Sequence, residues 1–388
     1  MAIASDAFKY FSYHLNFNRE YLINNRPLED LPSPQELTSA RNSYFYLIHQ
    51  GKVLTSQKEF EKLLGKINDK LWEEGAGEGD ERFVEFCKLL FLRLISNPNE
   101  AQSSWRNVIS HLQDQNLRTI INNELKKHQQ HYRIGKYASS LKIRDIVIIK
   151  EIVEEINNID FSQSDFDAKG VIFEYFLKRR GNDDLARYFT PRTVVRFMVN
   201  FLSPKLGEKI YDPFCGSGGM LIETYQFLHK QILLEEEEKG KKLHYLTKET
   251  FYGKDKASVA YVAKLNMILA GDGHNNIRRV KDTLKEKVEN KYEVVITNIP
   301  FNMTTKFGAV YEIPSDDANL ICVQHCLEAL KKTSTARAGI IVPDKFTFFN
   351  GYRDLRKKLF EEFAVTVVSL PLNTFTQTSG KGHVVFLE

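Results

Sequence analysis

The segment Tyr211–Met220, with the sequence YDPFCGSGGM, joins a short apolar run to a helix-like run through a turn that contains three glycines. Glycine allows positive φ and lets a ligand approach the backbone closely, because it has no Cβ atom. The N–H groups that begin the following helix can bind a polar or anionic ligand. The turn has neither the GxxxxGK(S/T) pattern of a phosphate-binding loop nor the GxGxxG of a nicotinamide-dependent oxidoreductase. It therefore predicts a site for a different ligand.

A second group of candidate residues, Asn298-Ile299-Pro300-Phe301, directly follows the apolar run Glu293–Thr297 (EVVIT). Asn-x-Pro-Phe alone is a common loop sequence. Here it lies where the fourth expected strand ends, and an open parallel sheet carries its chemistry at the carboxyl ends of its strands. Its position makes this segment a candidate for substrate contact.

The elements that must position these residues are those of an α/β fold. From about Tyr188, short β-branched runs alternate with helix-like stretches, which predicts a doubly wound parallel sheet covered by helices. The acidic, lysine-rich stretch Leu233–Lys242 is expected to be a solvated helix end or an insertion. The seven expected strands are Lys209–Asp212, Thr250–Gly253, Ile277–Val280, Glu293–Thr297, Gly339–Val342, Val365–Leu370 and His383–Leu387.

The earlier part of the chain predicts a mostly α-helical domain. Apolar residues recur at three- and four-residue steps in Phe83–Ile95 and Ile143–Ile156. The segment Gly75–Asp80 (GAGEGD) is expected to be a loop, since glycines and acids do not favour a helix. We therefore expect a mostly helical N-terminal domain over residues 1–165 and an α/β domain over residues 166–388.

Composition leaves the class of partner open. Hydrophobic residues make up 42% of the chain, which is ample for a core, and the formal net charge is only +4. A basic cleft can be offset by acidic surface such as Glu235–Glu238. Because non-specific DNA binding depends on phosphate neutralisation, this balance predicts weak affinity for DNA by the chain alone.

The four cysteines show no zinc-binding spacing. Cys322 and Cys326 lie one helical turn apart and are expected to be buried thiols on a helix, with no metal site. Such usage suits a reducing compartment. The N-terminus lacks the pattern of a signal peptide, and no apolar run approaches the ~20 residues that span a bilayer. We therefore expect a soluble, cytoplasmic protein without a membrane partner.

The glycine turn resembles the first motif of S-adenosylmethionine-dependent methyltransferases, in the form typical of the N6-adenine DNA methylase family. The resemblance covers residues 167–388 and implies a seven-stranded Rossmann-like domain, as in the modification subunit of a type I restriction system. It also implies that Asp255 binds the cofactor's ribose and that Asp282 contacts its adenine. The turn residues that it assigns to the cofactor are Asp212, Pro213, Cys215, Gly216, Ser217, Gly218 and Gly219.

The segment RYFTPR precedes the glycine turn. Thr190 followed by Pro191 predicts a helix N-cap with proline in the first helical position. The segment also resembles the family's QYFTPR, which implies that it lines the methionine side of the cofactor site. Arg187 replaces the family's glutamine, and contacts through the backbone or Thr190 are expected to survive that change. The residues concerned are Arg187, Tyr188, Phe189, Thr190, Pro191 and Arg192.

The segment Asn298–Phe301 resembles the Asn-Pro-Pro-Phe/Tyr motif of amino-methyltransferases. The N6 amine of adenine is a poor nucleophile because its lone pair is delocalised into the ring. The resemblance implies that the Asn298 side-chain oxygen and the residue 299 carbonyl accept from this amine and favour in-line attack on the methyl group. It implies that Phe301 stacks on the adenine, which must first leave the duplex.

This chain departs from the motif at Ile299, where the family has proline. Isoleucine still offers the main-chain carbonyl, but it lacks the fixed φ of proline. Ile299→Pro therefore tests whether a more rigid loop raises methylation, whereas Asn298→Ala is expected to abolish it.

The resemblance thus predicts a DNA adenine-N6 methyltransferase that uses S-adenosylmethionine. Its expected partners are double-stranded DNA, a separate specificity subunit and a restriction subunit. One alternative is a weakly active or silent cofactor-binding scaffold, with Ile299 as its signature. Another is an RNA guanine-N2 methyltransferase, because similar glycine turns occur there, although the RYFTPR segment and the helical N-terminal half disfavour it.

The two ends of the sequence carry little further information. Residues 1–60 show no resemblance to a known family. The last expected strand runs into Glu388, which leaves no room for a target-recognition domain. We therefore expect that a partner reads the DNA sequence, or that the chain is truncated.

Overall fold

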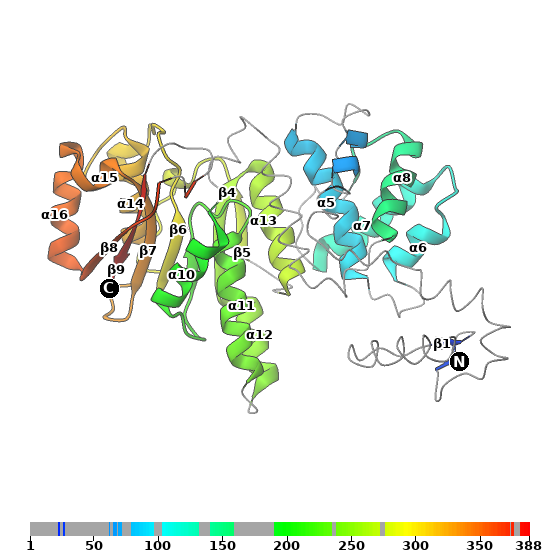
Figure 1. Cartoon of the computed structure of the whole chain (residues 1–388), viewed down its shortest axis with the longest axis horizontal. Coiled ribbons are helices and arrows are strands. Elements are labelled where there is room, and N and C mark those ends of the chain that lie inside the picture. The colour runs from blue at the N-terminus through cyan, green and yellow to red at the C-terminus, as the bar shows by residue number, and fades with distance from the viewer. Residues whose placement is uncertain are drawn as a thin grey trace, which may run out of the picture.

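The computed structural model combines a helical region with a sheet covered by helices (Figure 1). In Figure 1 the helices α5 to α8 form a group beside α13, and the sheet lies beyond α13. The structure describes residues 22–23, 26–27, 62, 65–67, 69–71, 79–96, 103–131, 140–158, 190–234, 238–271, 276–372, 374–375 and 381–388.

The helical region confirms the two amphipathic helices that the sequence predicts. Helix α8 begins at Ile146 because Asp145 caps it, accepting from the amide of Val147 at 2.7 Å. The prediction of a loop over Gly75–Asp80 is wrong at its end, since Gly79 and Asp80 already belong to α5. Burial of the apolar face of this helix outweighs the low helix propensity of glycine. Residues 75–78 lie outside the described residues. The helices are α5 (Gly79–Ile95), α6 (Ser104–Ser110), α7 (Leu117–His131) and α8 (Ile146–Asn157), and a two-residue pair, β1 (Leu22–Ile23) and β2 (Arg26–Pro27), precedes them.

A buried ion pair holds part of this region together. Lys88 on α5 pairs with Glu85, and both side chains are 1% exposed. Lys88 also donates to the carbonyl of Ser140 at 2.8 Å, and Glu85 accepts from the amide of Lys142 at 2.6 Å. Each charge thus contacts the chain that leads into α8, which offsets the cost of burying it.

All seven predicted strands form one sheet in the order β5-β4-β3-β6-β7-β9-β8. The central strands β3 and β6 are parallel neighbours, so the glycine turn and the Asn298 segment leave the sheet at the same edge. The strands are β3 (Ile210–Asp212), β4 (Phe251–Lys256), β5 (Asn276–Val280), β6 (Val294–Asn298), β7 (Arg337–Pro343), β8 (Val365–Ser369) and β9 (Gly382–Leu387).

The prediction of a parallel sheet is wrong for one strand. Strand β9 lies between β7 and β8 and runs antiparallel to both. Parallel neighbours need a crossover, usually a helix, whereas antiparallel strands can return directly. The run Leu370–Lys381 has no helix-like pattern, which favours the direct return.

Alternating strand residues enter two separate cores, as the two-residue period of a strand requires. Ile210 and Ile341 pack with helices α10, α11 and α13, whereas Tyr211 and Ile340 pack with α14, α15 and α16 on the other face. The helices are α10 (Arg192–Leu202), α11 (Gly219–Leu233), α12 (Lys239–Glu249), α13 (Ala257–Ala270), α14 (Ala318–Ala329), α15 (Lys345–Phe348) and α16 (Arg353–Glu362), with the short 3-10 turns η3 (Thr283–Lys285), η4 (Gly308–Val310) and η5 (Asn350–Tyr352).

Helix α13 is buried from two sides. Ala263 and Met267 belong to the core beneath the sheet, whereas Val262, Leu265 and Ile268 belong to the core of the helical region. The two cores therefore meet along this helix.

The charged stretch Leu233–Lys242 holds the end of α11 and the start of α12, in agreement with the sequence interpretation, although residues 235–237 are not described. Within the described residues, no helix combines the length and apolar character needed to cross a membrane.

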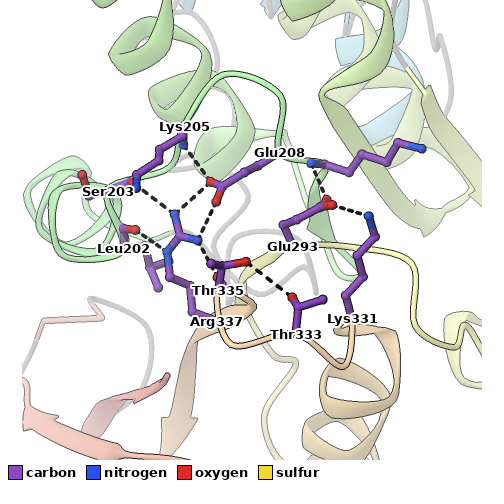
Figure 2. A network of polar contacts seen from close by, with 10 residues as sticks. Leu202, Ser203, Lys205, Glu208, Glu293, Lys331, Thr333, Thr335 and Arg337 are labelled. Atoms are coloured by element: carbon purple, nitrogen blue, oxygen red, sulfur yellow. Dashed lines mark hydrogen bonds and ion pairs between the residues drawn. The ribbon is translucent and has the colours of Figure 1, made fainter.

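Arg337, at the start of β7, connects this strand to Glu208 and to the end of α10 (Figure 2). Its guanidinium forms a two-pronged pair with Glu208, with distances of 2.8 and 2.9 Å. It also donates to the carbonyls of Leu202 and Ser203 at the end of α10, at 2.6 and 3.0 Å, and to Thr335 at 2.9 Å. All five N–H donors are thereby used, which only arginine can supply in this geometry.

Arg337→Ala is expected to lower the free energy of unfolding by about 2–4 kcal/mol, because the half-buried Glu208 carboxylate loses its charged partner and keeps only the amide of Lys205. Urea denaturation followed by circular dichroism measures the change. Lys241→Ala serves as the control, since its pair with Glu238 has side chains 82% and 60% exposed and should contribute no more than ~0.5 kcal/mol. Equal, small losses in both variants would contradict the role assigned to Arg337.

Candidate active site

The glycine turn begins where β3 ends at Asp212. Gly216 and Gly218 adopt positive φ, +52° and +89°, which favours glycine at both positions. The amide of Gly218 donates to the carbonyl of Cys215 at 2.7 Å, which closes the turn, and α11 begins at Gly219. A Cβ atom added at Gly216 or Gly219 would meet nothing within 4 Å. The turn thus presents open space beside the first amides of a helix.

Asp212 links the glycine turn to β6, the strand that ends at Asn298. Its Oδ1 accepts from the hydroxyl of Thr297 on β6 at 2.6 Å and from the amide of Phe214 at 3.1 Å. The side chains of Asp212 and Thr297 are both buried. Burial raises the pKa of Asp212 to about 7, against the effect of these hydrogen bonds, and the nearby Asp255 charge adds to the rise.

Asp255, at the end of β4, contacts the turn directly. Its Oδ2 accepts from the amide of Gly216 at 2.7 Å, and burial raises the pKa of this carboxyl. Asp282 lies close by, because Thr283 donates to the carbonyl of Pro213 at 3.0 Å. The Asp282 carboxylate itself accepts from the amide of Leu284 at 3.0 Å and caps η3. The structure thus brings both predicted acids to the turn, each with a local contact.

The prediction that Thr190 caps the next helix is wrong. Helix α10 begins at Arg192 with Pro191 in the cap position and no side-chain cap. The Thr190 hydroxyl instead accepts from Nδ2 of Asn298 at 3.1 Å, because the strand end that carries Asn298 offers a donor there. The guanidinium of Arg192 lies 3.8 Å from the carboxylate of Glu223 on α11, measured from Nη1 to Oε2. The predicted residues Arg187, Tyr188 and Phe189 lie outside the described residues.

The catalytic candidates continue β6 at its carboxyl end. Asn298 is the last residue of the strand and is 8% exposed, and Ile299 is fully buried. The ring of Phe301 meets that of Phe375 edge to face, with centroids 6.1 Å apart. Asn302 adopts left-handed φ of +56°, which turns the chain away from the strand.

Four residues that the sequence interpretation missed hold these loops. Thr297 binds Asp212; Asn266 on α13 donates to the carbonyl of Ser217 at 2.7 Å; Asn319 on α14 donates to the carbonyl of Pro300 at 2.5 Å; and Phe375 contacts Phe301. A detectable signal existed for one of them, since Asn266 is a lone polar residue between Leu265 and Met267, whereas Thr297 directly precedes Asn298. Asn319 and Phe375 carry no comparable signal.

Helix α14 contains the predicted pair of buried thiols. Cys322 and Cys326 are fully buried, and burial raises the pKa of both thiols. His325 between them is hydrogen-bonded to Tyr311 at 2.9 Å and to Tyr211 at 3.3 Å. Burial lowers its pKa to about 3, so it is neutral. No cluster of three or more potential ligands for a metal ion occurs among the described residues.

Comparison with known sequences places these features in a family context. The family model described as N-6 DNA Methylase matches residues 164–388. The methylase subunit of the type I restriction enzyme EcoEI from Escherichia coli is 29% identical over 252 residues, 62% of this chain and 50% of that protein. The StySJI methylase subunit from Salmonella typhimurium is 25% identical over 354 residues, 83% of this chain and 66% of that protein. This chain spans about half the length of the EcoEI subunit and similar curated relatives.

Solved structures agree with the predicted fold. A chain from a structure on complex assembly and conformational transition of the type I R-M system has a TM-score of 0.64 at 26% identity, over 86% of this chain and 75% of that chain. The methyltransferase subunit of a type I restriction-modification system from Streptococcus thermophilus has a TM-score of 0.58 at 16% identity, over 86% and 85% of the two chains. The expected Rossmann-like methyltransferase fold is thereby confirmed, apart from the direction of β9.

Asp212→Asn is expected to change how stability depends on pH. The unfolded carboxyl has a pKa of about 4 and the folded one about 7, so the folded chain binds the extra proton between these values. The stabilisation is complete below about pH 4 and is lost as pH rises through about 7. The asparagine variant should therefore gain on the parent by on the order of a few kcal/mol from about pH 5 to about pH 8. Urea denaturation of both proteins across this range measures the difference, and a difference that stays constant with pH would refute the assignment.

Proposed function

Because the chain belongs to the N-6 DNA methylase family, we propose that it transfers a methyl group from S-adenosylmethionine to the N6 amine of adenine in double-stranded DNA. The observation that carries the proposal is the 2.6 Å hydrogen bond from Thr297 to Asp212. It ties the strand that leads into the glycine turn to the strand that ends at Asn298. A turn suited to a cofactor and a loop suited to an amine thus adjoin one another.

The residues around the glycine turn fit S-adenosylmethionine. The open space at Gly216 and Gly219 leaves room for a ligand against the backbone, and the first N–H groups of α11 can bind a polar group of that ligand. Asp255 supplies acceptors for the ribose hydroxyls, and Asp282 supplies an acceptor for the adenine amine. When bound, the cofactor supplies an electrophilic methyl group on a positively charged sulfur.

The Asn298 loop supplies groups suited to an exocyclic amine. The Asn298 side-chain oxygen and the Ile299 carbonyl can each accept one N–H of the amine, which directs its lone pair toward the methyl group. The 3.1 Å bond from Asn298 Nδ2 to Thr190 holds the amide so that its oxygen is turned away from Thr190. Phe301 offers an aromatic face for the adenine, which must be turned out of the duplex to reach this loop.

We further propose that a specificity subunit selects the DNA sequence, and that a restriction subunit can join the same complex. Support comes from the relatives, which are named as methylase subunits of type I restriction enzymes. The near-neutral net charge of +4 agrees with a chain that depends on a partner for firm DNA binding.

Asn298→Ala is expected to lower methyl transfer at least ~100-fold, because it removes an acceptor aimed at the reacting amine. Cofactor affinity, measured by calorimetry, should change little. Asn200→Ala provides the control, since Asn200 is exposed on α10 and its side-chain amide donates to the Arg196 carbonyl of the same helix. An Asn298→Ala variant with parental activity would refute the catalytic role.

Transfer of labelled methyl groups to unmethylated DNA, with and without a specificity subunit, tests the function itself. Transfer to structured RNA alone would refute the proposal in favour of an RNA methyltransferase. Cofactor binding without transfer to any nucleic acid would indicate a silent scaffold.

A further inference from the structure

Hydrogen bonds hold the peptide between Ile299 and Pro300 on both sides. The amide of Ile299 donates to the carbonyl of Ile341 on β7 at 3.3 Å. Nδ2 of Asn319 on α14 donates to the carbonyl of Pro300 at 2.5 Å. The Ile299 carbonyl, the proposed acceptor for the amine, lies between these two contacts along the chain.

The contact on the first side depends on the residue that departs from the family motif. Proline has no N–H group, so isoleucine allows a bond to Ile341 that proline cannot form. This bond continues the pairing of β6 with β7, which otherwise ends at Asn298 opposite Ile341. The Ile299 side chain is fully buried in the core that includes Val342 and Phe346. Sheet pairing and packing therefore fix the backbone of Ile299, as the ring of a proline would do by fixing φ.

The contact on the second side comes from a firmly held helix end. Asn319 is fully buried. Its backbone N–H donates to the carboxylate of Asp317, the cap of α14, at 2.9 Å. Asp317 also accepts from Lys345 at 2.8 Å and from Tyr352 at 2.7 Å. Burial acts to raise the pKa of Asp317, but these hydrogen bonds outweigh it and hold the pKa below its usual value. The carboxylate thus stays charged and keeps the helix end in position.

The same helix end fixes the rest of the loop through the backbone. The amide of Ala318 donates to the carbonyl of Met303 at 3.0 Å, and the amide of Thr305 donates to the carbonyl of Asp316 at 2.9 Å. Among these contacts, Asn319 alone reaches the loop with a side chain, and it does so next to the proposed reacting carbonyl.

We propose that Ile299 and Asn319 are positioning residues for methyl transfer, which hold the Ile299 carbonyl in place from the two sides of its peptide. The inference rests on the proposed function. In the Asn-Pro-Pro-Phe/Tyr motif a proline at this position makes the loop rigid. Here sheet pairing and the Asn319 side chain supply that rigidity. The inference also implies that Ile299 is compatible with activity, and that proline at this position slows the reaction.

Single-turnover methyl transfer to DNA by the full chain with a specificity subunit tests this inference. Asn319→Asp keeps the shape but places an oxygen against the Pro300 carbonyl, and it should slow transfer at least ~10-fold, with the KM for S-adenosylmethionine within about threefold of the parent. Ile299→Pro should slow transfer similarly. Ile299→Val, which keeps the N–H and a branched side chain, should restore most of the rate that is lost in Ile299→Pro. Asn200→Asp on exposed α10 is the control and should stay near the parental rate.

Hydrogen exchange of the loop peptide 298–305 supplies a readout that needs no activity. Exchange should be faster in Asn319→Asp than in the parent and unchanged in Asn200→Asp. Parental rates of transfer in Asn319→Asp or in Ile299→Pro would overturn the inference, and so would unchanged exchange in Asn319→Asp. A parent that transfers no methyl group to DNA would instead refute the proposed function, and the exchange experiment would still decide whether Asn319 holds the loop.

Discussion

The hydrogen bond between Asp212 and Thr297 is the contact on which the site depends. Strands β3 and β6 pair through only two residue pairs, Ile210 with Val294 and Tyr211 with Val295, so the ends that carry the two loops need a further tie. A buried carboxyl that accepts from a buried hydroxyl supplies it, since leaving either group unpaired in the core costs more than the bond itself returns. The glycine turn and the Asn298 loop consequently keep a fixed spacing, and the other loops are arranged around them.

Much of the fold could be predicted because burial dictates residue type along these strands. Ile340 and Ile341 point to opposite cores, so β7 is apolar from Ala338 to Pro343 and lacks the polar alternation of a strand with one face in water. The direction of β9 could not be predicted in this way. The alternation of side chains has the same period in either direction, and the neighbours of a strand are chosen by contacts distant in sequence.

The candidate site was predictable only in its residue types. Glycines that need positive φ and acids at strand ends leave a trace in the sequence. The structure has Gly216 and Gly218 at positive φ and Asp255 in contact with the turn. The supports are different, because Asn319 and Phe375 come from segments without any motif. Thr190 shows a second limit. Its local pattern favours a helix cap, but a residue over a hundred positions later offers its hydroxyl a different partner.

Helix α13 contributes side chains both to the core of the helical region and to the core beneath the sheet, so these two parts of the chain share a helix. One face of the helix lies under the sheet and carries Asn266 to the glycine turn, while Val262, Leu265 and Ile268 complete the core of the helical region (Figure 1). Exposing any one of these three side chains to water would remove about 1.5–3 kcal/mol of stabilisation. The helical region is thus a structural counterpart of the sheet region, and exchanging it between relatives requires matching this shared surface.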